Sequence, residues 1–201
     1  MIKKFEDILD IINGKNQKKV ENPNGAYPIY GSGGVMGYAN DYLCKANTVV
    51  IGRKGNINNP IYVEEPFWNV DTAFGLVAKQ DILLSKYLYY FCVHYDFSKL
   101  NTTLTIQSLT KANLINVEID VPNIEEQKNI VMKLDSVIKL MRLQEEQIDS
   151  YDKLIKSRFV EMFGNPISNP MGWDKQPLAN ECDMVTGNTP SRKVPEYYGD
   201  Y

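Results

Sequence analysis

The segment between Pro122 and Gly164 contains neither proline nor glycine, and this constrains the chain more than any other feature. Asn123 is its first residue and suits the position before a helix, and Glu125 and Glu126 place negative charge in the first turn. Gly164 follows Phe163 as a typical helix terminator. We therefore predict one helix from Ile124 to Phe163, about 60 Å long at ~1.5 Å per residue.

Side chains along this helix form two rows that each recur every seventh residue, which is the spacing of a coiled coil. The first row is Leu134, Met141, Ile148, Ile155 and Met162, and the second is Ile130, Val137, Gln144, Tyr151 and Arg158. We call these two rows together the seam. The pattern predicts a partner helix, and polar residues within such a seam tend to fix register and partner choice. The alternative is a long helix packed along its own domain.

Charged residues on the outer faces of the helix fall at spacings that allow favourable pairs. The expected pairs are Asp135 with Lys139, Asp149 with Lys153, and Asp152 with Lys156.

Composition indicates an ordinary globular chain without a catalytic centre that depends on histidine or metal. No apolar run is long enough to span a bilayer, and the first residues do not resemble a signal peptide. Cys44, Cys92 and Cys182 are widely separated, as expected of reduced thiols in the core of a cytoplasmic protein. His94 is the single histidine, which argues against a metal site or triad built on histidine. We expect no bound cofactor and no membrane partner.

Residues 1–122 alternate between short apolar runs and turn residues, which predicts an α+β domain with several strands. Its predicted strands include segments 27–30, 47–52, 60–63, 72–77 and 116–121, with an amphipathic helix over 82–93. The long helix, with its flanking residues, forms a second region over 123–164. Residues 165–201 form a third region, a linker followed by what we expect to be the start of a second copy of the first domain.

That expectation rests on an internal repeat with a constant offset of 173 residues. Asp183-Met184-Val185-Thr186-Gly187 aligns with Asp10-Ile11-Ile12-Asn13-Gly14, so the acid, the apolar pair and the glycine are kept. The match is short, and chance similarity is the alternative. Residues 174–201 alone are too few to bury a core.

Several motifs partly match those of enzymes, but none matches fully. The run from Gly31 to Gly37 has Met36 where a dinucleotide-binding loop requires its last glycine, and it lacks the ending of a nucleotide-phosphate loop. A turn that needs positive φ explains these glycines better. Asn59-Pro60-Ile61-Tyr62 only partly resembles an adenine methyltransferase motif. No pairing of a nucleophile with a base emerges, so the sequence predicts no active site.

Polar and basic residues gather instead in loops that could contact DNA. Arg53, Lys54 and Asn56 follow a buried strand, and arginine and asparagine are common readers of guanine and adenine edges. Residues 1–122 carry 12 basic and 12 acidic residues, so any positive surface is local. A solvated loop is the alternative. The candidate DNA contacts are Lys15, Lys18, Lys19, Ser32, Arg53, Lys54, Asn56, Thr103 and Gln107.

Taken in order, these stretches resemble the specificity subunit of type I restriction–modification systems. The resemblance lies in the run from Tyr27 to Tyr38, in Val50–Asn56, in Trp68–Ala73 and in the run from Ile119 to Ile130, and the tail from Met184 to Lys193 resembles the start of another recognition domain. Asn123 stands where the family usually has a second proline. The chain also ends just inside the expected second domain, as a half-length or truncated form would.

The resemblance implies a non-catalytic subunit that reads double-stranded DNA. In the family two recognition domains are separated by two antiparallel helices, the methyltransferase subunits carry S-adenosylmethionine, and a restriction subunit cuts. For this chain it implies a homodimer formed through the seam. A coiled-coil scaffold or inhibitor whose globular head binds protein is the alternative, because that head is nearly neutral.

Overall fold

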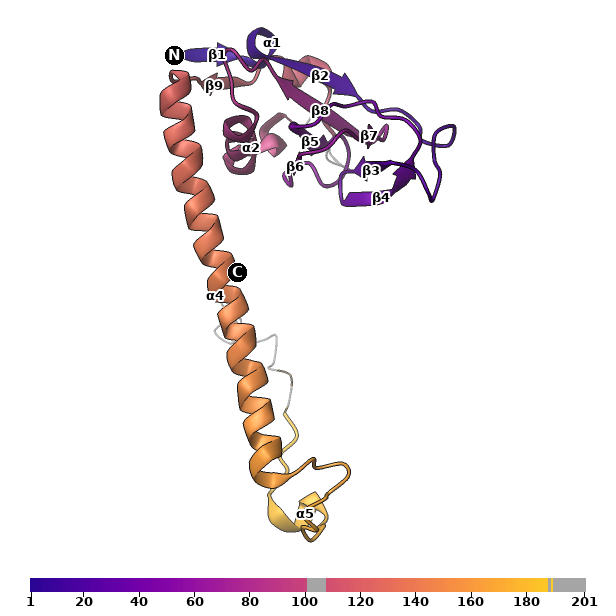
Figure 1. The fold of residues 1–201 in the computed structure, drawn as a ribbon, viewed down its shortest axis with the longest axis vertical. Coiled ribbons are helices and arrows are strands. Elements are labelled where there is room, and N and C mark those ends of the chain that lie inside the picture. The colour runs from indigo at the N-terminus through magenta and orange to yellow at the C-terminus, as the bar shows by residue number, and fades with distance from the viewer. Residues whose placement is uncertain (101–107, 188, 190–201) are drawn as a thin grey trace. The chain divides into compact units, whose positions relative to one another are not determined.

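In the computed structural model the chain divides into two compact units, Met1–Arg142 and Leu143–Tyr201. The structure describes residues 1–100, 108–187 and 189. The first unit holds the α+β domain, which we call the head, and the first part of the long helix (Figure 1). The predicted α+β class is confirmed.

The main sheet of the head has the strand order β2-β8-β5-β6, with all neighbours antiparallel. Its strands are β2 (Leu9–Asn13), β8 (Ala73–Ala78), β5 (Thr48–Gly52) and β6 (Ile61–Val63). Every residue of β5 is buried, as its continuous apolar sequence predicts. The two inner strands, β8 and β5, therefore form the centre of the domain.

Two smaller sheets flank the main one. One has the order β4-β3-β7 and consists of β4 (Gly34–Ala39), β3 (Tyr27–Gly31) and β7 (Trp68–Asn69). The other pairs β1 (Ile2–Lys4) with β9 (Glu118–Asp120), so the chain's first residues lie beside the strand that leads into the long helix. The sequence did not predict β1, β4 or β7.

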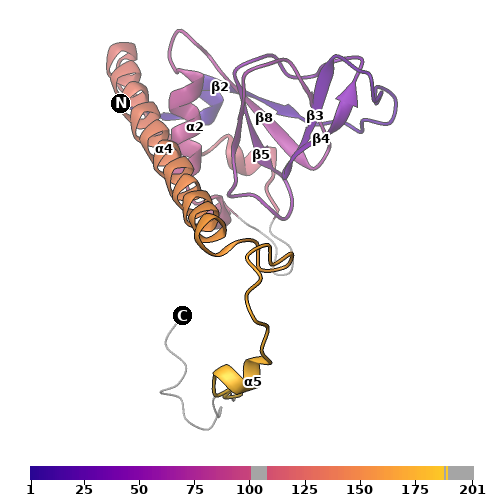
Figure 2. The same ribbon diagram turned by 60° about the horizontal axis from the view of Figure 1, so that its bottom comes forward.

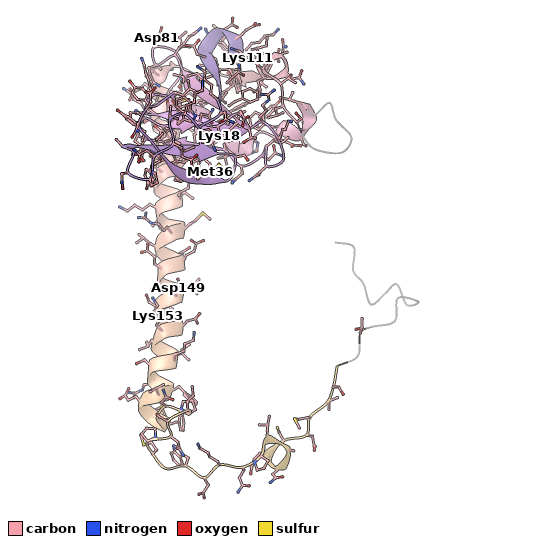
Figure 3. All side chains as sticks on the ribbon, turned by 90° about the vertical axis from the view of Figure 1, so that its right-hand side faces the viewer. Lys18, Met36, Asp81, Lys111, Asp149 and Lys153 are labelled. Atoms are coloured by element: carbon pink, nitrogen blue, oxygen red, sulfur yellow. The ribbon has the colours of Figure 1, made fainter. Side chains whose placement is uncertain are left out.

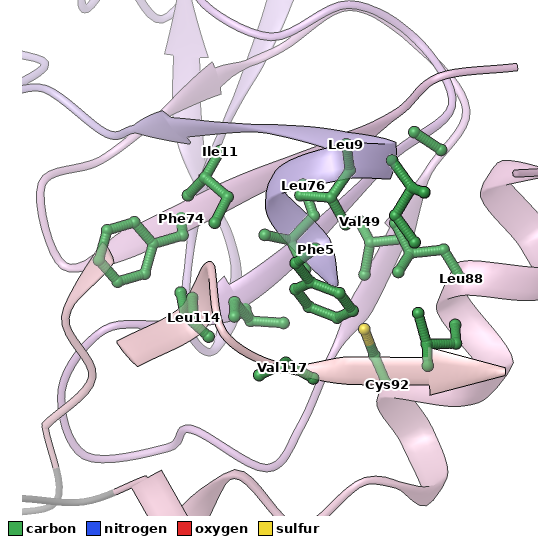
Figure 4. Packing of buried hydrophobic residues seen from close by; sticks show 14 of the residues in the cluster. Phe5, Leu9, Ile11, Val49, Phe74, Leu76, Leu88, Cys92, Leu114 and Val117 are labelled. Carbon is green, nitrogen blue, oxygen red and sulfur yellow. The ribbon is translucent and has the colours of Figure 1, made fainter. Parts of the chain in front are cut away.

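The main core lies between the large sheet and the short helices of the head (Figure 4). Those helices are α1 (Phe5–Ile8), α2 (Ser85–His94), the 3-10 turn η1 (Phe97–Leu100) and α3 (Lys111–Leu114). Phe5, Phe74, Leu76 and Leu88 are among its fully buried side chains. At roughly 25 cal/mol per Å² of apolar surface, such burial is the main stabilising contribution to the head.

The long helix α4 spans Ile124–Phe163, with the bounds that the sequence predicts. The Asn123 side chain accepts a hydrogen bond from the Glu126 N–H at 2.9 Å, which confirms the predicted N-cap. At the other end Gly164 has φ of 77° and its N–H bonds to the Val160 carbonyl, which satisfies one of the last carbonyls of the helix.

Beyond α4 the chain folds back over the end of the helix. The Trp173 indole N–H donates to the Phe163 carbonyl at 2.8 Å, and Asn169 bonds to both backbone groups of Trp173. The short helix α5 (Leu178–Glu181) follows and has no buried residue. The domain boundaries predicted from the sequence at 122 and 164 stay predictions.

Candidate nucleic-acid interface

Three strand ends meet at one end of the head, and the loops that carry the predicted DNA contacts leave from them. Because β2 and β5 both run antiparallel to β8, Asn13 pairs with Phe74 and Gly52 pairs with Ala73. The chain therefore leaves β2 and β5 at the point where it enters β8 (Figure 1). Loops positioned in this way by a rigid sheet are frequent sites of binding.

The loop after β5 presents Arg53, Lys54 and Asn56, all with exposed side chains. The Arg53 N–H donates to the Thr72 carbonyl at 2.7 Å, and the Arg53 carbonyl accepts from the Leu109 N–H at 2.9 Å. The Arg53 guanidinium lies 5.8 Å from the centre of the Phe74 ring, within the range of a cation–π contact. The backbone of this loop is thus fixed while its polar side chains face outward.

The turn between β3 and β4 lies against this loop. Gly31 pairs with Gly34 across the turn, and Gly34 has φ of 115°, so the glycines serve the turn that the sequence predicts. A Cβ added to Gly52 would lie 2.0 Å from the Asn56 carbonyl oxygen and 3.0 Å from the Ser32 Cβ. Only glycine permits this approach, which brings Ser32 beside the loop of Arg53.

Lys15 joins the same end of the sheet through its backbone. The Lys15 N–H donates to the Asn69 carbonyl at 2.8 Å, and the Lys15 carbonyl accepts from the Trp68 indole at 2.9 Å. A side chain at Gly14 would collide with the Val70 carbonyl. The structure thus brings Lys15, Ser32, Arg53, Lys54 and Asn56 to one end of the head, and we call these residues the loop cluster.

The other predicted contacts are placed differently. Lys18 and Lys19 are exposed in the loop after Lys15, and Figure 3 labels Lys18. This loop is fastened to β4 by the hydrogen bond from the Asn22 N–H to the Tyr38 carbonyl. Both lysines lie further along the chain from the strand ends than the loop cluster does. Thr103 and Gln107 lie outside the described residues.

Sequence reasoning missed the turn from Val70 to Ala73, which contributes exposed Asp71 and Thr72 beside Arg53. Asp71 brings an acidic group to an otherwise basic cluster. The Lys111 ammonium donates to the Ile11 carbonyl at 3.0 Å and so helps to hold β2.

A second feature is the junction between the head and the first turns of α4, which the sequence did not predict. The Gln127 side chain is fully buried. Its Oε1 accepts from the Leu84 N–H at 2.9 Å, and its Nε2 donates to the carbonyls of Ile82 and Pro122 at 2.9 and 2.8 Å. A buried amide with these partners fixes the start of α4 to the loop before α2.

About two turns further on, Asp135 of α4 contacts α2, and Figure 2 shows these two helices side by side. Its carboxylate lies 2.7 Å from the Lys86 ammonium and accepts a short hydrogen bond from the Tyr90 hydroxyl. Burial alone would raise the pKa of Asp135, but these two hydrogen bonds outweigh it and hold the pKa below its ordinary value. The prediction that Asp135 faces outward and pairs with Lys139 was wrong, because the acid faces α2 and pairs with Lys86.

Much of the predicted seam is exposed in the single chain. Val137, Met141, Ile148, Ile155 and Met162 each expose more than half of their surface, from 52% to 67%. Gln144 and Arg158 are also exposed, Tyr151 is 55% exposed, Leu134 is 37% exposed and Ile130 is half-buried. Asp149 and Lys153 likewise stand out from α4 (Figure 3).

The described residues contain no group of three or more His, Cys, Asp or Glu side chains that could hold a metal ion. Within the same ranges, no helix combines the length and the apolarity that crossing a membrane requires. Cys44 and Cys92 are buried as predicted, whereas Cys182 is exposed, so the prediction of a core thiol was wrong for Cys182. It lies just after α5, which has no core around it.

Comparison with known proteins gives one consistent answer. Residues 1–150 match the family model described as type I restriction modification DNA specificity domain. A Haemophilus influenzae protein that carries the name type I restriction enzyme specificity subunit is 24% identical over 144 residues, which cover 69% of this chain and 37% of that protein.

Solved structures share the fold. The S subunit of the type I restriction–modification system of M. genitalium superimposes with a TM-score of 0.60 at 19% identity, covering 81% of this chain and 45% of that one. A structure of a type I R-M system that concerns complex assembly and conformational transition gives a TM-score of 0.64 at 21% identity, covering 78% and 43%. The HsdS subunit of Thermoanaerobacter tengcongensis gives a TM-score of 0.59 at 19% identity, covering 73% of this chain and 39% of that one.

The chain thus spans less than half the length of each of these relatives. The family model nevertheless covers most of the chain, including the whole head and the first part of α4. The chain therefore belongs to the family of type I restriction modification DNA specificity domains.

Proposed function

We propose that the head reads one half of a split site in double-stranded DNA and that the chain has no catalytic activity of its own. The observation that carries this proposal is the loop cluster. Strands far apart in sequence deliver Lys15, Ser32, Arg53, Lys54 and Asn56 to one end of a rigid sheet. Lysine and backbone amides suit phosphate contacts, whereas arginine and asparagine suit base edges.

The family and the names of its members support the proposed partners. A specificity subunit acts within a complex, so we propose a methyltransferase subunit that carries S-adenosylmethionine and a restriction subunit with endonuclease and translocase activity. The chain itself then needs no cofactor. Such a complex acts on DNA, and we expect it in the cytoplasm.

The exposed seam of α4 supports a second copy of this chain as a further partner. We propose an antiparallel pairing of two α4 helices, so that the dimer carries two heads as the family's longer subunits carry two recognition domains. A two-fold dimer of identical heads recognises a palindromic split site, since symmetry of the protein is matched by symmetry of the DNA.

The test of base reading uses Arg53. Arg53→Ala removes both charge and hydrogen-bond geometry and is expected to cost about 1–3 kcal/mol of specific binding and to relax one position of the site. Arg53→Lys keeps the charge, so it should keep non-specific affinity but lose that discrimination. The readouts are the methylated motif in cells that carry the chain with its methyltransferase partner, and DNA affinity of the assembled complex.

Lys54 tests the phosphate contribution. Lys54→Ala should weaken binding to all DNA sequences alike. The slope of the logarithm of the binding constant against the logarithm of the salt concentration should become shallower by about one, the contribution of one phosphate contact. Lys45 precedes β5 and so lies at the opposite end of that strand, which makes Lys45→Ala a matched control that should change neither quantity. An unchanged motif in Arg53→Ala, together with unchanged salt dependence in Lys54→Ala, would refute the loop cluster as the DNA-binding surface. A complex without duplex affinity at any salt concentration would favour a head that binds protein.

A further inference from the structure

The exposed seam of α4 has ends that the structure itself defines. Seven residues before Leu134, the first row would continue at Gln127. The head buries this side chain completely, and it hydrogen-bonds there to backbone groups of Ile82, Leu84 and Pro122. The seam that remains for a partner therefore begins at Ile130. Its other end is Met162, because the helix stops at Phe163.

In an antiparallel pair of helices with a seven-residue repeat, each residue of one row faces a residue of the other row on the second helix. Several registers satisfy this rule, and they differ by one repeat, or about 10 Å of helix. The register is therefore a separate question from the existence of the dimer.

We propose that two copies of α4 pair so that Ile130 faces Met162 of the second copy and Gln144 faces Ile148 of the second copy. This inference rests on the proposed dimer and specifies how the two chains fit. The remaining facing pairs are Leu134 with Arg158, Val137 with Ile155, and Met141 with Tyr151. Every residue of the seam then has a partner, and the two-fold axis passes between Glu145 and Gln147.

Shifts by one repeat lose contacts at the ends. In one direction Arg158 would face Gln127, which is already enclosed by the head, and Met162 would face Asn123. In the other direction Ile130 and Leu134 would face residues beyond Gly164, where α4 has ended. Either shift leaves apolar side chains of both helices exposed to water, which makes the shifted dimer less stable.

Residues beside the seam favour the same register on one flank. Leu140 faces Leu154 of the second copy, and both side chains are 62% exposed in the single chain. Lys133 faces Glu161 of the second copy, a pairing of opposite charges. Glu161 also lies 2.6 Å from the guanidinium of Arg158 in its own chain, which neutralises the arginine within the seam.

The shifted registers replace these contacts with poorer ones. With the shift toward Asn123, Leu140 would face Gln147 and Glu161 would face Glu126, which carries the same charge. With the opposite shift, Leu140 would face Glu161. The other flank of the proposed register is less favourable, because Glu145 faces Glu145 of the second copy across the axis and Ile138 faces Asp152. The repulsion between like charges on such an exposed flank is modest and is screened by salt.

Disulfide formation between two single-cysteine variants tests the register directly. Cys182→Ser removes the exposed native thiol, whereas Cys44 and Cys92 are buried and burial raises the pKa of Cys44 to about 12. In this background, tagged Val137→Cys is mixed in turn with Ile155→Cys, Ile148→Cys and Met162→Cys, and oxidised after subunit exchange. All four replaced side chains are exposed in the single chain.

The proposed register requires Val137→Cys to link with Ile155→Cys at roughly ten times the yield of the other two mixtures, because a disulfide tolerates only about 7 Å between Cα atoms. Circular dichroism of each variant checks that the helix is retained, and Met141→Cys with Tyr151→Cys repeats the test at another layer.

The other outcomes separate the register from the dimer. A dominant link to Ile148→Cys or Met162→Cys would overturn the register and leave the antiparallel dimer standing. Linkage of Val137→Cys with itself would indicate parallel helices and overturn both. Sedimentation that shows only monomers at micromolar concentration would likewise remove the dimer and its register, while the loop cluster is tested separately by DNA binding.

Discussion

Two short helices of this chain, α1 and α5, have the same local structure and opposite surroundings. Each spans four residues, and the two are separated by the same 173 positions as the sequence repeat. Each is followed by a residue with extended backbone whose N–H donates a hydrogen bond to the carbonyl of the first helical residue. In α1 the Leu9 N–H donates to the Phe5 carbonyl, and in α5 the Cys182 N–H donates to the Leu178 carbonyl. Phe5 and Ile8 of α1 are fully buried, whereas Leu178 of α5 is 66% exposed.

The comparison shows that the helical turn is set locally and the core is not. The Phe5 ring packs at an edge against the ring of Phe91 in α2, and β2 continues from α1 into the main sheet. The described residues after α5 include no strand that could play the part of β8. The recurrence of the turn is consistent with the sequence-based prediction, which stays a prediction, that a second recognition domain begins at this point.

The largest expected effect comes from truncating the equivalent side chains of α1 and α5. Phe5→Ala should lower the free energy of unfolding by about 3–5 kcal/mol, because it leaves a cavity in the main core. Leu178→Ala should change it by less than about 0.5 kcal/mol, since the side chain is exposed. Denaturant unfolding of the full chain, followed by circular dichroism, measures both, and comparable losses would mean that α5 packs on a core of its own.

A buried polar residue sharpens the same contrast. Gln127→Leu leaves the Leu84 N–H and the carbonyls of Ile82 and Pro122 without their partner, which is expected to cost about 1–3 kcal/mol. Gln176→Leu, the same change just before α5, should be close to neutral. Equal stabilities for Gln127→Leu and the unmodified chain would show that these hydrogen bonds do not hold the head to α4.

The smallest expected effect concerns pH. The lowered pKa of Asp135 means that its bonds to Lys86 and Tyr90 stabilise the fold above the ordinary Asp pKa of about 3.9, and that this contribution is lost as pH falls through the lowered value. Because both charged groups are more than a third exposed, we expect at most about 1 kcal/mol.

Asp135→Asn should therefore reduce stability by a constant amount at neutral pH, and the deficit should shrink as the pH falls below about 4. Asp149→Asn, further along α4, is the matched control. Thermal unfolding measured between pH 3 and 8 on the unmodified chain and both variants gives the comparison. A deficit for Asp135→Asn that persists unchanged at pH 3 would mean that the asparagine disturbs packing rather than removing an ionised partner.

The elements that the sequence predicts well are those with local signals. Asn123 and Gly164 mark the ends of α4, and the apolar run from Thr48 to Gly52 marks a buried strand. The pairing of β1 with β9 had no such signal, because Ile2 meets Asp120 from the far end of the domain. Strand β4 escaped prediction because its glycines and exposed Val35, Met36 and Tyr38 break the usual alternation.

Polar residues on α4 were the least predictable. Gln127 and Asp135 look like exposed helix residues in sequence, and an acid four positions before a lysine suggests a local pair. Their partners come from α2 and the loop before it, so only the packed structure reveals them.

The sequence by itself determined the caps and the repeating seam of α4 and the turn glycines of the head, because helix ends, helix faces and positive φ depend on neighbouring residues. Only the tertiary structure decided that the ends of β2 and β5 would bring Lys15, Ser32 and Arg53 together. It also decided that Gln127 would be buried by the head, which leaves Ile130 as the first residue of the seam. Those placements depend on contacts between segments far apart in the chain, which no local pattern specifies.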